Sequence, residues 1–368
     1  MNGNKYTHLE ISVPNIQHNL KYFRSFLNES TKLLVLVKAY GYGHGIGEFS
    51  RILEDNGVDY LAVAFPGEGV TIREAGVKLP VIVLSGGMEH YPLMIQYRLE
   101  PSIPCPEAFE RFVKEAGAMK QKDYPVHIKL DTGMHRLGAE EEGIQSIVEK
   151  LPGSGSVRIA SVFSHFVASG EEKNDNFTRQ QIARFETLFN LLTDQLGYIP
   201  MRHLLNSPGI ERFAAEAQYD MARLGIGLYG MSYVDKCRLK PTAFLRTPVL
   251  QVKTVQPGET VGYSRAGKVT TPDTRIATLA IGYADGVNRH LSNGKASFCV
   301  NGHRAPTIGN ICMDMCMLDV TGIDVKPGDM VTVFGDDPTI FELADILGTI
   351  PYEILTSVAY RVPRIYTF

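Results

Sequence analysis

Apolar residues in the first two thirds of the chain occur in short, regularly spaced runs. Between these runs lie amphipathic stretches, such as residues 47–56, 107–119 and 178–196, in which apolar residues recur every three or four positions. This alternation predicts short buried strands that are each followed by a helix. The predicted strands cover residues 33–37, 60–64, 80–84, 99–103, 126–130, 158–163, 201–205 and 221–224.

Eight strand-then-helix units within about 200 residues predict an α/β fold, a closed (β/α)8 barrel of the TIM type with parallel strands. An open, doubly wound parallel sheet is the structural alternative. In a barrel of this kind, functional side chains are expected at the carboxyl ends of the strands.

The pattern changes after about residue 240, where Pro-Gly turns separate runs typical of strands. These runs cover residues 248–254, 275–281, 296–300, 311–320 and 330–334. We therefore predict a barrel domain at residues 10–238 and a β-rich C-terminal domain at residues 239–368, joined by a hinge at residues 237–241. Residues 1–9 could pair with the second domain.

Composition narrows the class of partner. The 368 residues are 44% hydrophobic and carry a formal net charge of −3 without a long basic block, so nucleic acid and membrane surfaces are not expected partners. No segment resembles a signal peptide or a membrane span, and we expect a cytoplasmic protein that acts on a small molecule. The five cysteines contain no C-x-x-C pair, and neither a disulfide framework nor a metal site, including one built from His303, Cys312 and Cys316, is predicted.

Lys38 is the first candidate for chemistry, because it follows the apolar run at residues 33–37 and precedes a glycine-rich stretch. Desolvation lowers the pKa of a lysine, and the neutral amine can form a Schiff base with a carbonyl. Many lysines at strand ends simply reach solvent. The glycine spacing at 41, 43, 45 and 47 does not match a dinucleotide-binding motif.

Further polar residues follow the other predicted strands, so that all converge on one barrel mouth. Each has a structural explanation by itself: His165 could be a hydrogen-bonded core residue, and residues 206–208 could be a turn. Their shared location favours a functional site. The set comprises Lys38, Lys129, Asp131, Arg136, His165, Asn206, Ser207 and Arg223.

Five motifs resemble the alanine racemase family in order and spacing over essentially the whole chain. They are Val-Lys-Ala-Tyr-Gly-Tyr-Gly-His-Gly (37–45), Lys-Leu-Asp-Thr-Gly-Met-His-Arg-Leu-Gly (129–138), Arg-Leu-Gly-Ile-Gly-Leu-Tyr-Gly (223–230), Gly-Tyr-Ala-Asp-Gly (282–286) and Cys-Met-Asp-Met (312–315). The resemblance implies a barrel that binds pyridoxal 5'-phosphate and a homodimer with shared active sites. It also implies interconversion of L- and D-alanine by two bases acting on a pyridoxal phosphate aldimine, which supplies D-alanine for peptidoglycan.

The resemblance also assigns residues to the cofactor. Lys38 would form the aldimine, and Arg223, with His165 behind it, would face the pyridine nitrogen. Because a guanidinium keeps its proton, the ring would be a weaker electron sink, which suits racemisation. Arg136 would lie near the cofactor's phenolic oxygen. The remaining assigned residues would hold the phosphate or line the pocket around it: Tyr42, Asn206, Ser207, Gly225, Ile226 and Tyr352.

For the reaction itself, the resemblance implies that Lys38 and Tyr263 are the two bases, one on each face of the substrate carbon. Arg136 would also contact the substrate carboxylate, and Lys129 matches a lysine that is often carbamylated in this family. Met313, Cys312, Asp314 and Tyr283 of the other subunit would line the substrate pocket.

Several positions depart from the family pattern. Gly170 and Asn310 stand where an acidic residue and an arginine are common, so the charge pair of the substrate entrance is missing. Val287 and Asn288 replace a usual Tyr-Pro before Arg289, and Leu224 replaces a common proline. These changes affect the expected substrate preference more than the expected chemistry.

Three alternatives remain open from the sequence. A pyridoxal phosphate carrier protein would have only the barrel, which the C-terminal domain argues against. A related decarboxylase would place an acidic residue at the pyridine nitrogen, unlike Arg223. A racemase of serine, or of a broader set of amino acids, would need only small changes in the pocket.

Overall fold

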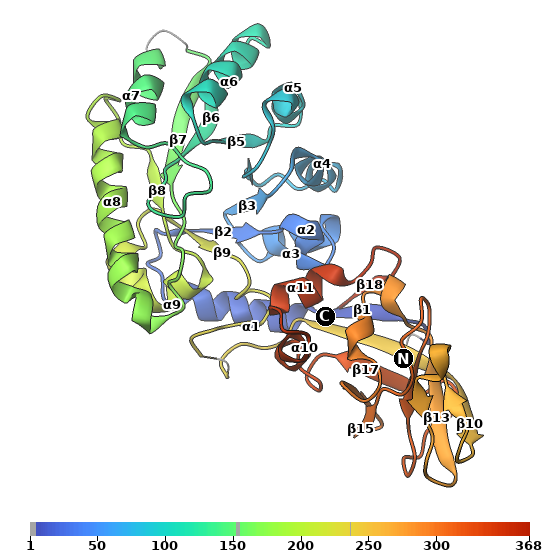
Figure 1. Cartoon of the computed structure of the whole chain (residues 1–368). Helices are drawn as coiled ribbons and strands as arrows, with labels where there is room; N and C mark the ends of the chain where they lie inside the picture. The colour runs from blue at the N-terminus through green and yellow to red at the C-terminus, as the bar shows by residue number, and fades with distance from the viewer. Residues whose placement is uncertain (1–4, 152–154, 236) are drawn as a thin grey trace. The chain divides into compact units, whose positions relative to one another are not determined.

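The computed structural model describes residues 5–151, 155–235 and 237–368, which form two compact units (Figure 1). One unit comprises Gln17–Gly41 and Ile46–Leu239, and is called the barrel unit below. The other, the β unit, comprises the described residues before Gln17, the short segment Tyr42–Gly45, and Lys240–Phe368. The boundary between units therefore crosses the stretch that follows Lys38.

The barrel unit is built on eight parallel strands in the order β8-β7-β6-β5-β4-β3-β2-β9. Backbone hydrogen bonds from Asp220 N to Arg202 O (3.2 Å) and from Arg223 N to Leu205 O (3.1 Å) join the two ends of this order, so the sheet is nearly closed. The strands are β2 (Lys32–Leu36), β3 (Tyr60–Val63), β4 (Val81–Val83), β5 (Glu100–Ile103), β6 (Tyr124–Lys129), β7 (Val157–Phe163), β8 (Met201–His203) and β9 (Met221–Leu224).

Helices cover the outside of these strands, as Figure 1 shows for α4 to α8. The helices are amphipathic, because their buried residues recur at helical spacing, as Phe185, Leu188 and Leu192 do in α8. The helical segments that begin or lie in this unit are α1 (Val13–Arg24, which starts in the β unit), α2 (Lys38–Tyr42), α3 (Gly47–Asp55), α4 (Pro66–Glu74), α5 (Tyr91–Gln96), α6 (Pro106–Ala118), α7 (Glu141–Lys150), α8 (Asp175–Thr193), α9 (Ser207–Ala217) and the short η1 (Met88–His90) and η2 (Glu172–Asn174).

The β unit centres on the long strand β10 (Ala243–Val255), which serves two parts of one sheet. Its first half pairs with β1 (His8–Ser12) and β17 (Met330–Phe334), and its second half pairs with β13 (Thr274–Leu279) after a register shift between Val249 and Gln251. The sheet also contains β14 (Ser297–Val300), β15 (His303–Pro306), β16 (Cys316–Asp319) and β18 (Arg364–Thr367).

Short elements of the β unit carry most of its predicted site residues. The hairpin of β11 (Thr260–Val261) and β12 (Gly267–Lys268) encloses the turn η3 (Tyr263–Arg265). Two further turns, η4 (Tyr283–Asp285) and η5 (Arg289–Leu291), follow β13, and the helices α10 (Ile340–Leu347) and α11 (Pro351–Ser357) follow β17.

The structure confirms the predicted fold class and all eight predicted barrel strands. Two details of the prediction are wrong. Only Cys316–Asp319 of the run 311–320 is a strand, because residues 312–315 form a tight loop closed by a hydrogen bond from Cys312 N to Met315 O (2.8 Å). Strands β11, β12, β15 and β18 were not predicted, nor was a strand at residues 10–12 of β1. The glycine-rich stretch after Lys38 forms a compact left-handed turn.

The predicted domain boundary between residues 238 and 239 stays a prediction. Residues 1–9 were predicted to pair with the β-rich domain, and residues 1–4 of this segment lie outside the described residues. None of the helices in the described part of the chain has the length and apolar composition that crossing a bilayer requires.

Candidate active site

The predicted site residues of the barrel unit all lie at the carboxyl ends of its strands. Lys38 follows β2, Lys129 is the last residue of β6, and Arg223 lies one residue before the end of β9. Asp131, Arg136, His165, Asn206 and Ser207 lie in the segments that follow β6, β7 and β8. Parallel strands place these ends at one mouth of the barrel.

The turn after Lys38 has an unusual backbone. Ala39 (φ 52°), Tyr40 (φ 56°) and Tyr42 (φ 48°) are left-handed although none is a glycine. This conformation costs roughly 1–2 kcal/mol per residue, so other contacts must hold it. Gly41 N donates a hydrogen bond to Val37 O (2.9 Å), and the Ala39 N–H donates one to Glu68 Oε1 (2.6 Å). The turn fixes the direction in which Lys38 leaves the strand.

Positive charge is concentrated at this mouth. Burial lowers the pKa of Lys38, as does the Arg136 guanidinium, whereas Glu68 raises it. Burial, followed by the charges of Arg136 and Arg223, lowers the pKa of Lys129 to about 8. Such a cluster favours neutral amines and binding of an anion.

His165 lies among the same charges. Burial and the neighbouring cations, first Arg223 and then Arg136, lower the pKa of His165 to about 3. The imidazole is therefore neutral at ordinary pH. Its Nδ1 lies 3.4 Å from an Arg223 nitrogen, which is consistent with a weak bond donated by the guanidinium.

Arg223 is buried and held from several sides. Its guanidinium donates to the carbonyl oxygens of Ser164 (2.5 Å), His203 (2.9 Å) and Leu204 (3.0 Å). Burial lowers the pKa of Arg223 to about 9, which still leaves the group charged at neutral pH. These bonds fix the plane of the guanidinium.

His203, which the sequence did not single out, also contacts Arg223. Its Nδ1 lies 3.0 Å from Arg223 Nη1, and its Nε2 lies 2.8 Å from Ser161 Oγ. Burial and the Arg223 charge lower the pKa of His203, so its ring accepts the guanidinium bond as a neutral imidazole. Within the apolar run 201–205, nothing in the local pattern distinguished this histidine from a core residue.

Ser207 is the first residue of α9, and its hydroxyl lies at a meeting point of several backbone groups. Ser207 Oγ accepts bonds from the Gly225 N–H (2.9 Å) and the Gly227 N–H (3.2 Å), so the hydroxyl and two amides meet at one point. Asn206 caps the helix, since its Oδ1 accepts from Gly209 N (2.9 Å) and from Ser169 Oγ (2.7 Å). Helix N-termini with free donors commonly bind phosphate.

The segment after β6 is shaped by Asp131. Its Oδ1 accepts bonds from the N–H groups of Gly133 (2.9 Å), Met134 (3.0 Å) and His135 (3.2 Å). Although burial opposes it, these bonds lower the pKa of Asp131. The resulting turn leads to Arg136, which is exposed.

In the β unit, Tyr42 and Tyr352 lie close together, with ring centroids 6.1 Å apart. The segment that carries Tyr42 is held by the C-terminal strand: Arg364 Nε donates to Gly43 O (2.8 Å), and the Tyr366 hydroxyl donates to His44 O (2.6 Å). Gly43 is required, because an added Cβ would lie 2.3 Å from Leu355 O.

Tyr263 lies in the turn of the β11–β12 hairpin and is 71% exposed. It borders a shallow pocket with Cys312, Met313 and Asp314, which the sequence predicted to share its site. Asn310, one of the departures from the family pattern, donates from Nδ2 to Tyr263 O (3.1 Å). Asn310 therefore supports the tyrosine loop in place of the charge that an arginine would bring.

The segment at Tyr283 is joined to the segment at residues 312–315. The Tyr283 N–H donates to Cys312 O (2.9 Å). Arg361 then links both segments, because Nε donates to Asp285 Oδ1 (2.7 Å) and Nη2 donates to Asp314 Oδ1 (2.6 Å). Arg361 was not predicted as a site residue, because its two partners lie far from it along the chain.

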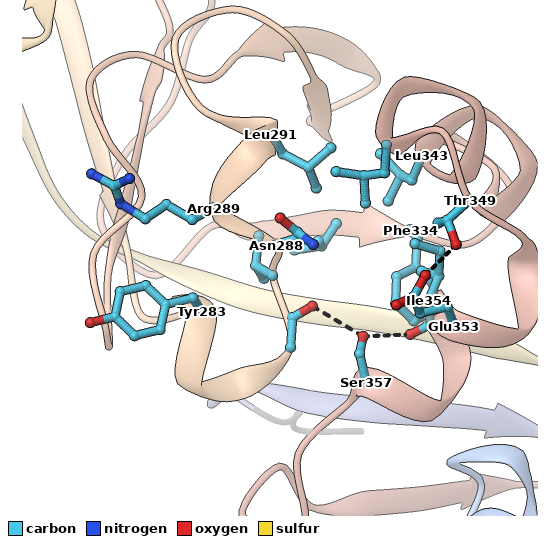
Figure 2. Close-up of a pocket in the computed structure, with 14 residues that line it drawn as sticks. Tyr283, Asn288, Arg289, Leu291, Phe334, Leu343, Thr349, Glu353, Ile354 and Ser357 are labelled. Atoms are coloured by element: carbon cyan, nitrogen blue, oxygen red, sulfur yellow. Dashed lines mark hydrogen bonds between the residues drawn. The ribbon is translucent and has the colours of Figure 1, made fainter.

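An apolar cavity of about 450 Å³ lies beside Tyr283 within the β unit. Figure 2 shows Tyr283 and Arg289 on one side of it, and Leu291, Leu343 and Phe334 on the other. Ser357 Oγ donates to Ile354 O (2.9 Å) and to Gly286 O (3.3 Å), so the Tyr283 turn is tied to α11, the helix that carries Tyr352.

The structure thus brings the predicted residues together in two groups, one in each unit. The barrel group comprises the basic residues and the anion donors, and the β-unit group comprises the tyrosines and the loop at residues 312–315. A parallel barrel with a buried amine among cations at its mouth, followed by a β-rich domain, defines the class of a barrel enzyme that binds an anionic cofactor.

Comparison with known proteins identifies the family. Residues 11–233 match the model of the alanine racemase N-terminal domain, and residues 242–366 match that of the alanine racemase C-terminal domain. The chain belongs to the alanine racemase family.

Individual relatives agree over nearly full length. "Alanine racemase 1" of Clostridium acetobutylicum is 37% identical over 97% of this chain and 94% of its own length. The structure of an alanine racemase of Clostridium difficile superposes with a TM-score of 0.90 at 32% identity, covering 98% of this chain and 95% of that one. A Bartonella henselae alanine racemase with covalently bound pyridoxal phosphate gives 0.86 at 27% identity, covering 98% and 99%.

Proposed function

We propose that this chain interconverts L-alanine and D-alanine with pyridoxal 5'-phosphate, and so supplies D-alanine for peptidoglycan. The observation that carries the proposal is Lys38, an amine with a lowered pKa at the carboxyl end of β2, within a cluster of positive charge. Membership of the alanine racemase family and the covalently bound pyridoxal phosphate of the Bartonella relative support it.

The residues at the barrel mouth fit the cofactor by their donor chemistry. Ser207 Oγ accepts from the amides of Gly225 and Gly227, so its own O–H can donate to a phosphate at the start of α9. We assign Gly225 and Ile226 to the loop that borders this phosphate. We assign the hydroxyls of Tyr42 and Tyr352 to the same phosphate. Pyridoxal phosphate, when bound, withdraws electrons from the substrate α-carbon and makes its proton removable.

Arg223 is assigned to the pyridine nitrogen of the cofactor. In that position it is suited to limit the withdrawal of electrons from the substrate α-carbon. Its pKa of about 9 keeps it charged, and its bonds to three carbonyl oxygens hold it in one orientation. A guanidinium donates a hydrogen bond without giving up its proton, which favours return of a proton to the substrate carbon. His165 stays neutral beside it.

Two groups move the proton. Lys38 Nζ serves one face of the substrate carbon, and its lowered pKa increases the fraction of neutral amine that can accept a proton. Tyr263 Oη serves the other face. An ordinary phenol has a pKa of about 10, so positive charge near the hydroxyl would be needed to favour the phenolate.

Substrate binding is assigned to Arg136 for the carboxylate, and to Cys312, Met313, Asp314 and Tyr283 for the pocket wall. Carbamylation of Lys129 would supply a negative charge that pairs with Arg136, and burial already makes this amine more often neutral. The wall leaves alanine as the preferred substrate, with serine next in size.

We further propose that each site is completed by a second copy of the chain. Tyr263 is 71% exposed and Met313 is 54% exposed, which is unusual for a catalytic base and a pocket wall. A two-fold dimer would cover these residues and place Tyr263 of one chain opposite Lys38 of the other.

The direct test is to incubate the holoenzyme with single L-amino acids and follow the D-isomer by chiral chromatography. L-Alanine should be converted fastest and approach an equal mixture of isomers, and Lys38→Ala should abolish conversion. Each added methylene should change discrimination by about 1–3 kcal/mol. Faster conversion of lysine or arginine would contradict the substrate assignment, and release of CO2 would indicate a decarboxylase.

A further inference from the structure

Glu68 contacts the ends of two neighbouring barrel strands. Its Oε2 accepts hydrogen bonds from Ala64 N (2.8 Å) and Phe65 N (3.1 Å), just after β3. Its Oε1 accepts from Ala39 N (2.6 Å), one residue after Lys38 at the end of β2. One carboxylate therefore joins the segment that carries Lys38 to the beginning of α4.

Capping of α4 does not account for the whole arrangement. A glutamate at the third position of a helix stabilises the N-terminus through the amide before the helix, which here is the Phe65 N–H bonded to Oε2. The bond from Ala39 to Oε1 adds nothing to that helix. It satisfies a backbone donor in the left-handed turn, where Ala39 and Tyr40 have φ values of 52° and 56°.

We propose that Glu68 is a positioning residue for Lys38: it holds the left-handed turn at residues 39–41 and places its negative charge beside the Lys38 amine. The proposal rests on the proposed function in assigning the cofactor to Lys38. Glu68 is partly buried, and both of its carboxylate oxygens accept backbone hydrogen bonds, which fix its orientation.

The charge of Glu68 acts against the cations around Lys38. Arg136 and burial lower the pKa of the Lys38 amine, Glu68 raises it, and Lys38 also interacts with Lys129 and the neutral His165. Removing the carboxylate should lower the pKa of Lys38 further. Loss of the bond to Ala39 should also let the turn relax and move Lys38 from its reactive position.

Two substitutions separate position from charge. Glu68→Gln keeps the side-chain length but removes the charge, and its amide offers only one acceptor oxygen for two sets of donors. Glu68→Asp keeps the charge but withdraws it by one methylene from Ala39. Glu107→Gln is the matched control, because Glu107 is an exposed glutamate in the first turn of α6, which follows β5 as α4 follows β3.

The first measurement uses the cofactor-free protein. Lys38 is methylated with formaldehyde and cyanoborohydride over a pH series, and modification of the peptide containing Lys38 is followed by mass spectrometry. Glu68→Gln should shift the labelling profile to lower pH, whereas Glu68→Asp and Glu107→Gln should stay near the unsubstituted protein. An unchanged profile in Glu68→Gln would overturn the electrostatic part of the proposal.

The second measurement compares kcat, KM and the thermal midpoint of the holoenzymes. Both Glu68 variants should lose roughly 10- to 100-fold in kcat with little change in KM, because a displacement of about 1 Å can cost this much. Glu107→Gln should retain kcat. If the Glu68 variants lose thermal stability but keep kcat, Glu68 is simply a helix cap and the proposal is wrong.

Failure of this proposal is distinguishable from failure of the proposed function. If the unsubstituted holoenzyme does not racemise alanine but the labelling profile of Glu68→Gln still shifts, the function is wrong and the influence of Glu68 on Lys38 stands. If alanine is racemised and neither labelling nor kcat responds, the function stands and the positioning role is rejected.

Discussion

Basic side chains at the barrel mouth interact closely enough to alter one another's protonation. Lys38, Lys129 and Arg223 all have lowered pKa values, with burial as the first cause in each case. Burying like charges together is costly unless an anion joins them. A phosphate, a carboxylate or a carbamate would relieve this cost, so binding of the cofactor should stabilise the fold as well as enable the reaction.

Lys129 permits a test of this electrostatic cost. Its pKa falls from the ordinary value of 10.5 to about 8 in the folded protein. Between these pH values the unfolded chain binds a proton that the folded chain does not, so the free energy of unfolding should rise with pH there. Relative to Lys129→Met, the cofactor-free protein should gain roughly 3 kcal/mol between pH 8 and 10.5.

The measurement is urea unfolding in CO2-free buffer, with the exposed Lys122→Met as control. The control should leave the pH dependence unchanged. Added bicarbonate should weaken the dependence if the neutral amine attacks CO2, forms the N–C bond of a carbamate and releases a proton. Intact-mass analysis would then show the added CO2. If the difference in unfolding free energy between the unsubstituted protein and Lys129→Met does not change with pH in CO2-free buffer, the lowered pKa of Lys129 is contradicted.

At the scale of elements, several segments of the site are held in place by side chains from distant parts of the sequence. Arg361 joins the turn η4 to the loop at residues 312–315, and Arg364 and Tyr366 hold the segment Tyr42–Gly45. The start of α9 is held by residues of its own sequence instead. Asn206 is the N-cap of this helix, and the adjacent Ser207 is its first residue and accepts a hydrogen bond from Gly225 N. Local stability and cofactor binding should therefore be coupled at α9.

Asn206→Ala tests this coupling. Loss of the bonds to Gly209 and Ser169 should lower the free energy of unfolding by about 1 kcal/mol, as for other N-caps, and should weaken binding of pyridoxal phosphate because Ser207 is less well fixed. Thr339→Ala removes the N-cap of α10, where Thr339 Oγ1 accepts from Glu342 N (3.2 Å), and is the matched control.

Fluorescence titration of the cofactor and thermal unfolding should be measured on both variants. A similar loss of stability with weaker cofactor binding only in Asn206→Ala is the expected result. Equal cofactor affinity in the two variants would show that the α9 terminus does not contribute to binding.

At the scale of the whole molecule, the two groups of site residues lie in different units. Lys38 and Arg223 belong to the barrel unit, and Tyr263 and Met313 belong to the β unit. The proposed two-fold dimer lets each site take one group from each chain. The exposure of Tyr263 in the single chain agrees with this arrangement.

Complementation between inactive variants distinguishes a shared site from a site within one chain. Lys38→Ala and Tyr263→Ala should each be nearly inactive alone. After subunit exchange, about half of the dimers should be mixed and half of the sites in these should be intact, so roughly a quarter of the original activity should return. Exchange, measured with differently labelled chains, without any recovery would place both bases in one chain.

The periodicity of apolar residues predicted the strands and helices of the barrel unit, whereas strand pairing decided between a barrel and an open doubly wound sheet. Runs such as residues 33–37 are buried on both faces, and their length and spacing with amphipathic segments suffice to predict strands and helices. Strand β18 and most of β1 escaped prediction, because they pair only with segments far away along the chain. Strand β15 escaped it because three of its four residues are exposed. The local sequence pattern does not show which residues of these strands become buried, because their burial depends on the strands they pair with.

Residue types and motifs likewise indicated Lys38, Arg223 and Tyr263, since their chemistry is tied to sequence context. Tertiary structure decided what surrounds them: the left-handed turn held by Glu68, the neutral His203 against Arg223, and the bridge from Arg361 to two aspartates. These contacts join residues 20 to 76 positions apart along the chain. A sequence pattern reports which side chains are present, whereas their orientation and protonation depend on neighbours that only folding supplies.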